Sequence, residues 1–191
     1  MTTLQDTPRA NRLHIGIFGK RNSGKSTLLN AITGQELAVV SDQPGTTTDP
    51  VYKAMELAGV GPVVWIDTAG FDDEGELGQK RVGKTRLAAE RADLALMVFS
   101  AMPDEEKAWV SMLKERGVPL IPVITKIDLL PDLPALAQAV EALCDVPPLL
   151  VNGLANQDLQ QVRERIIRQL PDDFAPASLI SGLAQPGDTV L

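Results

Sequence analysis

Cysteine and histidine are almost missing from this chain: among its 191 residues there is one of each, Cys144 and His14. A single cysteine excludes an internal disulfide, and it excludes a cysteine cluster for zinc or an iron–sulfur centre within this chain. We expect Cys144 to be a core residue, because it falls on the apolar face of a predicted helix. His14 opens a predicted strand, and we expect a satisfied sheet residue there rather than a ligand.

Long apolar runs are missing as well. No segment approaches the ~18 apolar residues of a membrane span, and the polar residues 1–11 lack the apolar core of a signal peptide. The net charge of −7 and the pI near 4.7 disfavour bulk attraction to nucleic acid or to an anionic membrane. We therefore expect a cytoplasmic protein without a membrane partner. The acidic balance argues against nucleic acid, although a local basic patch could still bind RNA.

Short apolar runs alternate with amphipathic stretches along most of the chain. This pattern predicts an α/β fold, with a six-stranded, mostly parallel sheet and helices on both faces. The connection at 58–62 is so short that the two strands it joins must pair antiparallel, which places one antiparallel strand at an edge. The expected strands are 13–18, 51–57, 63–66, 94–99, 120–124 and 147–151.

Three regions are expected from composition and periodicity. Residues 1–11 form an N-terminal extension, and residues 12–170 form one α/β domain. Beyond residue 170 the periodicity fades and proline and glycine interrupt the chain. We expect residues 171–191 to be a linker and the start of a truncated following domain, with a docked tail as the alternative.

The motif Gly19–Ser26 matches the phosphate-binding pattern G-x-x-x-x-G-K-[ST] at every fixed position. It lies between a predicted strand at 13–18 and a predicted helix that begins near residue 27. Such a strand–loop–helix unit directs backbone N–H groups and a helix N-terminus at a polyphosphate. Its lysine, Lys25, would reach the β/γ-phosphates, and the Ser26 hydroxyl would bind Mg²⁺. The sequence therefore predicts a nucleoside triphosphate site.

Two further motifs follow predicted strands. Asp67–Gly70 has the form D-x-x-G, in which the carboxylate can hold Mg²⁺ through water and the Gly70 N–H can sense a γ-phosphate. Thr125–Asp128 follows the next-to-last strand, where a carboxylate can accept both N1–H and N2–H of guanine but meets a lone pair on adenine. The Lys126 stem can lie along the base. The alternative for Asp128 is an aspartate that only caps a turn.

Four segments together resemble, in order and spacing, the G1 to G4 motifs of translation-factor-class GTPases with a Ras-like fold. The segment Gly45–Asp49 is similar to switch I of the Era and tRNA-modification GTPase group. That resemblance implies that Thr47 binds Mg²⁺, with Thr46 beside it. The four segments are Gly19–Ser26, Gly45–Thr47, Asp67–Gly70 and Thr125–Asp128.

Within that group, the segments Asp67–Gly78 and Leu179–Asp188 resemble the HydF family, the maturation GTPases of FeFe-hydrogenases. HydF proteins carry a GTPase domain, a dimerisation domain and a cysteine-ligated iron–sulfur domain, and they act as a scaffold for the diiron precursor. The resemblance implies that this chain is the GTPase module alone, without the cluster. It implies other hydrogenase maturation proteins and the apo-hydrogenase as partners.

The chain departs from the family pattern at three places. Thr125 replaces an asparagine that contacts the base and ties the loops together, so we expect weaker guanine binding. The loop after the last strand offers only the Gly153 N–H to the guanine oxygen, with Leu154 beside it. The Arg of the switch I pattern is Thr48.

Hydrolysis must use a group other than the glutamine of Ras-like enzymes, because Phe71 follows D-x-x-G. Asp73 aligns best with the catalytic acid of the tRNA-modification GTPases; Asp72 and Glu74 are the other candidates, and an acidic loop without catalytic part is the alternative. Asn22 matches the residue that holds K⁺ in potassium-activated relatives, or else it only satisfies loop backbone. Such a K⁺ site implies a homodimer through the GTPase domains or through a missing domain.

These inferences assign the nucleotide site and its chemistry to one set of residues. GTP or GDP, Mg²⁺ and K⁺ are the expected ligands, and Lys25, Thr47, Gly70, Asp72 and Asp73 are the expected catalytic groups. The expected metal-binding residues are Ser26, Thr47 and Asp67 for Mg²⁺, and Asn22 for K⁺. The residues expected at the nucleotide are Gly19, Asn22, Ser23, Gly24, Lys25, Ser26, Thr27, Thr46, Thr47, Asp67, Gly70, Thr125, Lys126, Asp128, Gly153 and Leu154.

We predict a GTP-hydrolysing switch domain of the hydrogenase-maturation scaffold, slow alone and stimulated by potassium. The alternatives are an RNA-directed relative of the Era or tRNA-modification type, a switch with negligible hydrolysis, and an ATP-using P-loop protein, against which Asp128 argues. A basic stretch from Lys80 to Arg91 is expected to be a solvated helix face or, alternatively, a partner contact.

Overall fold

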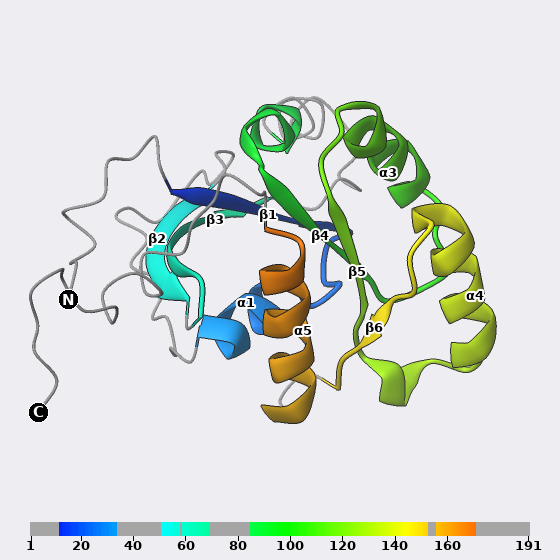
Figure 1. Cartoon of the computed structure of the whole chain (residues 1–191). Helices are drawn as coiled ribbons and strands as arrows, with labels where there is room; N and C mark the ends of the chain where they lie inside the picture. The colour runs from blue at the N-terminus through cyan, green and yellow to red at the C-terminus, as the bar shows by residue number, and fades with distance from the viewer. Residues whose placement is uncertain (1–11, 34–50, 58, 69–84, 153–155, 171–191) are drawn as a thin grey trace, which may run out of the picture.

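The computed structural model describes residues 12–33, 51–57, 59–68, 85–152 and 156–170. These residues form one six-stranded sheet in the order β2-β3-β1-β4-β5-β6 (Figure 1). The strands are β1 (Leu13–Gly19), β2 (Val51–Leu57), β3 (Gly61–Asp67), β4 (Leu94–Phe99), β5 (Leu120–Ile124) and β6 (Leu149–Leu150).

All neighbouring strands pair in parallel except β2 and β3, which form an antiparallel hairpin at one edge. The prediction of a mostly parallel sheet with one antiparallel edge strand is therefore confirmed. The predicted last strand, 147–151, was too long, since only Leu149–Leu150 pairs with β5. The strand is followed by Val151, whose N–H still donates to the Ile124 carbonyl (2.8 Å).

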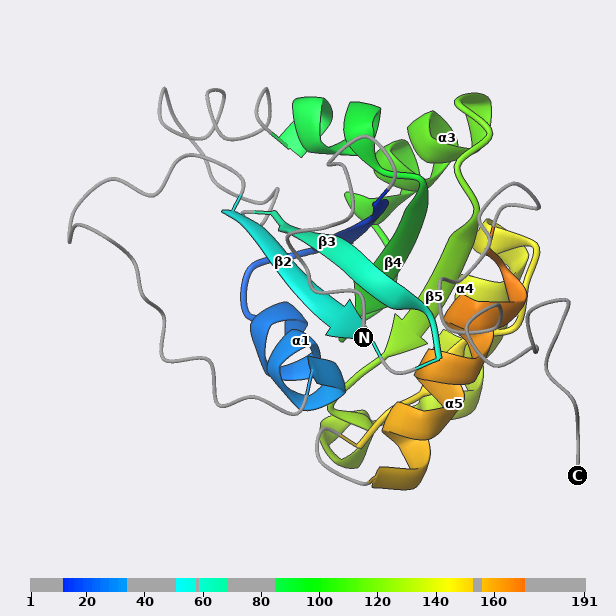
Figure 2. The same cartoon turned by 60° about the vertical axis from the view of Figure 1, so that its left-hand side comes forward.

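The helices are α1 (Lys25–Thr33), α3 (Glu106–Glu115), α4 (Leu133–Cys144) and α5 (Asn156–Arg168), with a short 3₁₀ turn, η2 (Ile127–Leu129). Residues 85–91 are also helical. Figure 2 shows α1 and α5 on one side of the sheet and the helix at 85–91 with α3 on the other. The described residues include no helix that is long and apolar enough to cross a membrane.

Strand β4 shows why the sheet needs helices on both faces. All six of its residues are buried, and successive side chains of a strand point to opposite faces. Leu94, Leu96 and Val98 join the core beneath α1 and α5. Ala95, Met97 and Phe99 join the second core, which α3, α4 and the helix at 85–91 cover. A central strand that is apolar on both faces is typical of a parallel sheet buried between two helical layers.

Cys144 and His14 lie where the sequence predicted. Cys144 is buried at the end of α4 and is a free thiol, and burial raises its pKa to about 11. His14 lies in β1 and shares reciprocal contacts with Asp93, whose carboxylate accepts from the His14 backbone N–H (2.8 Å). The Asp93 N–H in turn donates to the His14 carbonyl (2.9 Å). Within the described residues, Cys144 is therefore a core residue and His14 is a paired residue of the sheet, as the sequence predicted.

The carboxyl ends of β1, β3 and β5 lie at one edge of the sheet, because these strands belong to its parallel part. The chain leaves β1 into the segment before α1, leaves β3 at Asp67, and leaves β5 at Thr125. Open α/β sheets bind their ligands at this edge. The fold thus brings three motifs that are far apart in sequence to one place.

Candidate functional site

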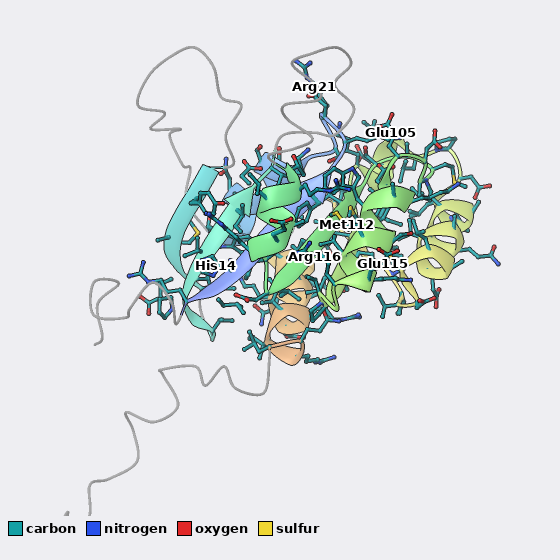
Figure 3. The ribbon with its side chains drawn as sticks, turned by 90° about the horizontal axis from the view of Figure 1, so that it is seen from above. His14, Arg21, Glu105, Met112, Glu115 and Arg116 are labelled. Carbon is teal, nitrogen blue, oxygen red and sulfur yellow. The ribbon has the colours of Figure 1, made fainter. Side chains whose placement is uncertain are left out.

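The loop between β1 and α1 has a backbone that only glycine tolerates at its first position. Gly19 has φ 151°, and a Cβ there would lie 2.5 Å from the Val98 carbonyl oxygen. Gly24, just before α1, has φ 93°. Asn22 at the turn of the loop has φ 58°, a left-handed conformation that asparagine adopts more readily than most residues. Figure 3 shows Arg21 projecting from this loop, far from His14 at the other end of β1.

Lys25 lies inside this loop rather than in solvent. It is the first residue of α1, its side chain is only 7% exposed, and its Nζ donates to the carbonyls of Gly19 (2.9 Å) and Lys20 (2.6 Å). The N-terminal N–H groups of a helix have no partner within the helix, and together with the helix dipole they favour an anion. The loop therefore places a buried ammonium next to a helix N-terminus, as phosphate binding requires.

Asp67 ends β3 beside the phosphate loop, in register with Ile17 of β1. Burial raises the pKa of its carboxyl above the usual value, and the positive charges of Lys53 and Lys25 oppose that shift. The next residue, Thr68, is buried and donates its hydroxyl to the Ile17 carbonyl (2.7 Å), which fixes the end of β3 against β1. A partly dehydrated carboxylate at this point is costly unless a cation approaches it.

The oxygen ligands that the described residues offer beside the phosphate loop are of the kind that Mg²⁺ binds. The Asp67 carboxylate and the Ser26 hydroxyl are oxygen ligands of the kind that Mg²⁺ takes, usually together with water and substrate phosphates. Ser26 lines a cavity at the phosphate loop together with Lys25. A bound Mg²⁺ would neutralise phosphate charge here, and the fold supplies these two residues to hold it.

Thr125 connects the loop after β5 to the phosphate loop. Its buried hydroxyl lies 2.6 Å from the Ser23 carbonyl, to which it donates, and 3.3 Å from the Phe99 carbonyl. Its backbone N–H donates to the Phe99 carbonyl as well (2.9 Å). Threonine therefore retains the loop tie that the family resemblance assigned to asparagine. Its expected effect on guanine binding stays a prediction.

Lys126 and Asp128 lie on the solvent side of the same loop. Lys126 has a left-handed backbone (φ 53°), and its Nζ donates to the Asn22 carbonyl at the turn of the phosphate loop (2.5 Å). Asp128 lies in η2 and is exposed. The loop after β5 thus holds the phosphate loop at two points, through Thr125 and through Lys126, while the Asp128 carboxylate stays open to a ligand.

Two cavities meet along this edge. One, of about 400 Å³, is lined by Asn22, Lys25 and Ser26, and the other, of about 140 Å³, is lined by Thr125, Asp128 and Asn152. Gly24, Thr27 and Lys126 line both. One polar cavity at a lysine and a helix N-terminus, joined to a second beside a carboxylate, suits a phosphate group and a base of the same nucleotide.

One interaction at the site was not predicted from the sequence. Glu106, at the start of α3, is buried, and its Oε2 lies 3.5 Å from Nζ of Lys20 in the phosphate loop. The two residues are far apart in the chain. Lys20 occupies a variable position of the phosphate-loop motif, Glu106 belongs to no motif, and the acidic run around residue 105 looks like a solvated helix start. Helical spacing could have separated Glu106 from its exposed neighbour Glu105, because Glu106 shares the buried face of α3 with Val110 and Leu113.

The remaining predicted site residues lie outside the described residues, so their positions stay predictions. They include the switch I pair, the glycine of D-x-x-G and the acidic candidates that follow it, and the two residues after β6. These are Thr46, Thr47, Gly70, Asp72, Asp73, Glu74, Gly153 and Leu154.

Comparison with known protein families gives one match that covers more than half of the chain. Residues 14–126 match the family described as 50S ribosome-binding GTPase. The chain belongs to this GTPase family. The matched segment runs from β1 to Lys126, so it contains the phosphate loop, Asp67 and the tie made by Thr125.

Two curated relatives show which GTPases of this family the chain is similar to. GTPase Der of Deinococcus deserti is 36% identical over 132 residues, which are 67% of this chain and 30% of the relative. The tRNA modification GTPase MnmE of Xanthomonas oryzae pv. oryzae is 35% identical over 169 residues, which are 85% of this chain and 36% of the relative. The chain thus spans about a third of the length of these relatives.

Solved structures share the fold. A variant of Era from Aquifex aeolicus, bound to GDP and aluminium fluoride, superposes with a TM-score of 0.64 at 25% identity, covering 83% of this chain and 57% of that one. The G domain of the T. maritima FeoB iron transporter gives 0.60 at 20% identity, covering 82% of this chain and 98% of that one, and shows the fold alone. The chain is therefore a GTP-binding GTPase domain of the Era, Der and MnmE type, with a Ras-like fold.

Proposed function

We propose that this GTPase domain hydrolyses GTP slowly and acts as a switch for domains or partners outside the chain. The observation that supports the proposal is that two cavities share part of their lining, with the buried ammonium of Lys25 in one and the exposed carboxylate of Asp128 in the other. Lys25 and the α1 N-terminus would bind the phosphates, and Asp128 would accept hydrogen bonds from guanine. Ser26 and Asp67 would hold Mg²⁺.

We further propose that K⁺ stimulates hydrolysis and that Asn22 helps to hold it. Asn22 lines the phosphate cavity, and the Lys126 ammonium fixes its backbone carbonyl, so its side chain is presented from a defined loop. A monovalent cation at this point would offset the charge that develops on the phosphates, as an arginine finger does. Ordering of switch I by dimerisation of two GTPase domains would complete the site.

Single-turnover hydrolysis of GTP in KCl and in NaCl, at matched ionic strength, tests this proposal. We expect a faster rate in KCl, a loss of the difference in Asn22→Ala, and a specific activity that rises with protein concentration. Equal rates in both salts would overturn the potassium site. Binding of GTP without measurable turnover in either salt would favour a switch whose state is set by nucleotide exchange.

Two proposals concern the process that the switch serves. The name of one relative, tRNA modification GTPase MnmE, and the family description, 50S ribosome-binding GTPase, support an RNA-directed process better than they support hydrogenase maturation. The match is confined to about a third of each relative, however, and the net charge of −7 disfavours RNA. The hydrogenase-maturation proposal is supported by the HydF resemblance of Asp67–Gly78 and Leu179–Asp188.

Deletion of the gene separates these two processes. Loss of FeFe-hydrogenase activity with intact tRNA modification and ribosome assembly would support the HydF proposal. A defect in tRNA modification or in ribosome assembly, with hydrogenase unaffected, would support the RNA-directed proposal. Either result leaves the GTPase activity of the domain itself to be tested by the kinetics above.

A further inference from the structure

Glu106 is a buried carboxylate with a specific partner in the phosphate loop. It is 2% exposed, it accepts the Asp104 N–H (3.1 Å), and it lies 3.5 Å from the Lys20 ammonium. A buried carboxylate is costly unless hydrogen bonds and an opposite charge satisfy it. Lys20 supplies such a charge from the phosphate loop.

Lys20 also contributes to the loop through its backbone. Its carbonyl accepts from the Lys25 Nζ (2.6 Å) and from the Ser23 N–H (3.2 Å). The residue that Glu106 holds by its side chain therefore presents the carbonyl that orients the phosphate-binding ammonium. Three residues form a continuous path from α3 to the ammonium of the phosphate loop: Glu106, Lys20 and Lys25.

We infer that Glu106 is a positioning residue for GTP hydrolysis, acting on Lys25 through Lys20. The inference rests on the proposed function, because it concerns how accurately Lys25 meets the phosphates. Glu106 lines neither of the two cavities at the site. It fixes the first half of the phosphate loop to α3, as Thr125 fixes the second half to the loop after β5.

The path predicts a selective kinetic effect. The charge that Lys25 stabilises grows in the transition state, so a small displacement of its ammonium affects the chemical step more than ground-state binding. We expect Glu106→Gln to lower kcat by about tenfold to a hundredfold, with a change in the KM for GTP of less than about threefold. Lys20→Met, which keeps the apolar stem and removes the charge, should reproduce this result.

The test is the hydrolysis of GTP by the full chain, with GDP affinity and thermal unfolding measured on the same preparations. The double variant Glu106→Gln with Lys20→Met should be no slower than either single variant, because residues that act as one unit are not additive. Glu106→Asp should recover part of the lost kcat. Glu105→Gln is the matched control, since it removes the same charge one residue away on an exposed side chain, and it should match the original chain.

Each other outcome counts against the inference. Additive losses in the double variant, or a kcat of Glu106→Gln equal to that of the original chain, would overturn it. So would a lower unfolding temperature in Glu106→Gln combined with an unchanged kcat in Lys20→Met, which is the result that a merely structural role predicts. If the original chain neither binds nor hydrolyses GTP, the proposed function fails first, and the inference falls with it.

Discussion

The two halves of the nucleotide site are built in different ways. In the phosphate half, Lys25 is buried and bonded to two backbone carbonyls, and the buried Ser23 presents its carbonyl to Thr125. In the base half, Lys126 and Asp128 are exposed, and Asp128 lies in a short 3₁₀ turn. An unpaired polar group is costly where it is buried, whereas water can satisfy an exposed one.

This difference separates affinity for phosphate from choice of base. Residues of the phosphate half serve folding and binding together, so a substitution there should change both. In the base half, the exposed Asp128 should contribute little to stability, so its substitution should change nucleotide preference alone. Thr125 lies at the boundary, with a buried hydroxyl that joins the two halves.

The largest expected effect is on base preference. Asp128→Asn replaces an acceptor by an amide that complements xanthine rather than guanine, and we expect affinity for GTP to fall by about a hundredfold while XTP gains. Because Asp128 is exposed, the unfolding temperature should stay unchanged. Isothermal calorimetry with both nucleotides measures the preference. Asp132→Asn is the matched control, because it removes the same charge from an exposed side chain and keeps an oxygen that can accept the Ala135 N–H at the α4 N-cap; it should change neither stability nor preference.

At Asp67, a change in pH should affect the stability of the apo-protein and its Mg²⁺-dependent nucleotide affinity in opposite directions. Its raised pKa means that the folded apo-protein holds a proton more tightly than the unfolded chain does. Stability of the apo-protein should therefore fall as pH rises from the ordinary value through the raised one, whereas Mg²⁺-dependent nucleotide affinity should fall as pH decreases through the same window. Asp67→Asn should remove both dependences and weaken Mg²⁺-GTP by about tenfold or more.

Denaturant unfolding and calorimetry across pH, each with and without Mg²⁺, check this prediction. Asp93→Asn is the matched control, because Asp93 lies at the other end of the parallel strands beside His14. A Mg²⁺-GTP affinity in Asp67→Asn equal to that of the original chain would contradict the assignment of Asp67 as a metal-binding residue.

The smallest expected effect is at the boundary. Thr125→Val removes the hydroxyl bonded to the Ser23 carbonyl and leaves a buried acceptor with one partner fewer, which should cost about 1–2 kcal/mol of unfolding free energy. Affinity for GTP should fall by a few-fold, as the loop positions loosen. Thr125→Ser retains the hydroxyl and should keep most of the affinity. If Thr125→Val and Thr125→Ser bind GTP equally well, the tie has no part in binding.

Local sequence patterns predicted the parts of the site that a single segment encodes. The glycines and Lys25 of the phosphate loop could be found because a strand, a turn and a helix start occur within a few residues. Asp67 could be found because it ends an apolar run. The sheet could be predicted as mostly parallel from the alternation of apolar and amphipathic segments, and the hairpin of β2 and β3 from its short connection.

Contacts between distant segments could not be predicted in this way. The bond from Thr125 to Ser23 spans 102 residues and the bond from Lys126 to Asn22 spans 104. The pairing of Lys20 with Glu106 depends on where α3 begins after β4, and an exposed glutamate stands next to the buried one. The partners of Thr125, Lys126 and Lys20 depend on the order of the strands in the sheet, and no local pattern specifies that order.

Calorimetric titration of the chain with GTP, GDP and ATP in the presence of Mg²⁺ tests the central claim most directly. The account predicts tight and comparable binding of GTP and GDP, since the phosphate loop and Asp128 serve both, and ATP binding weaker by about a hundredfold or more. Equal affinity for ATP, or no uptake of any of the three nucleotides, would contradict it.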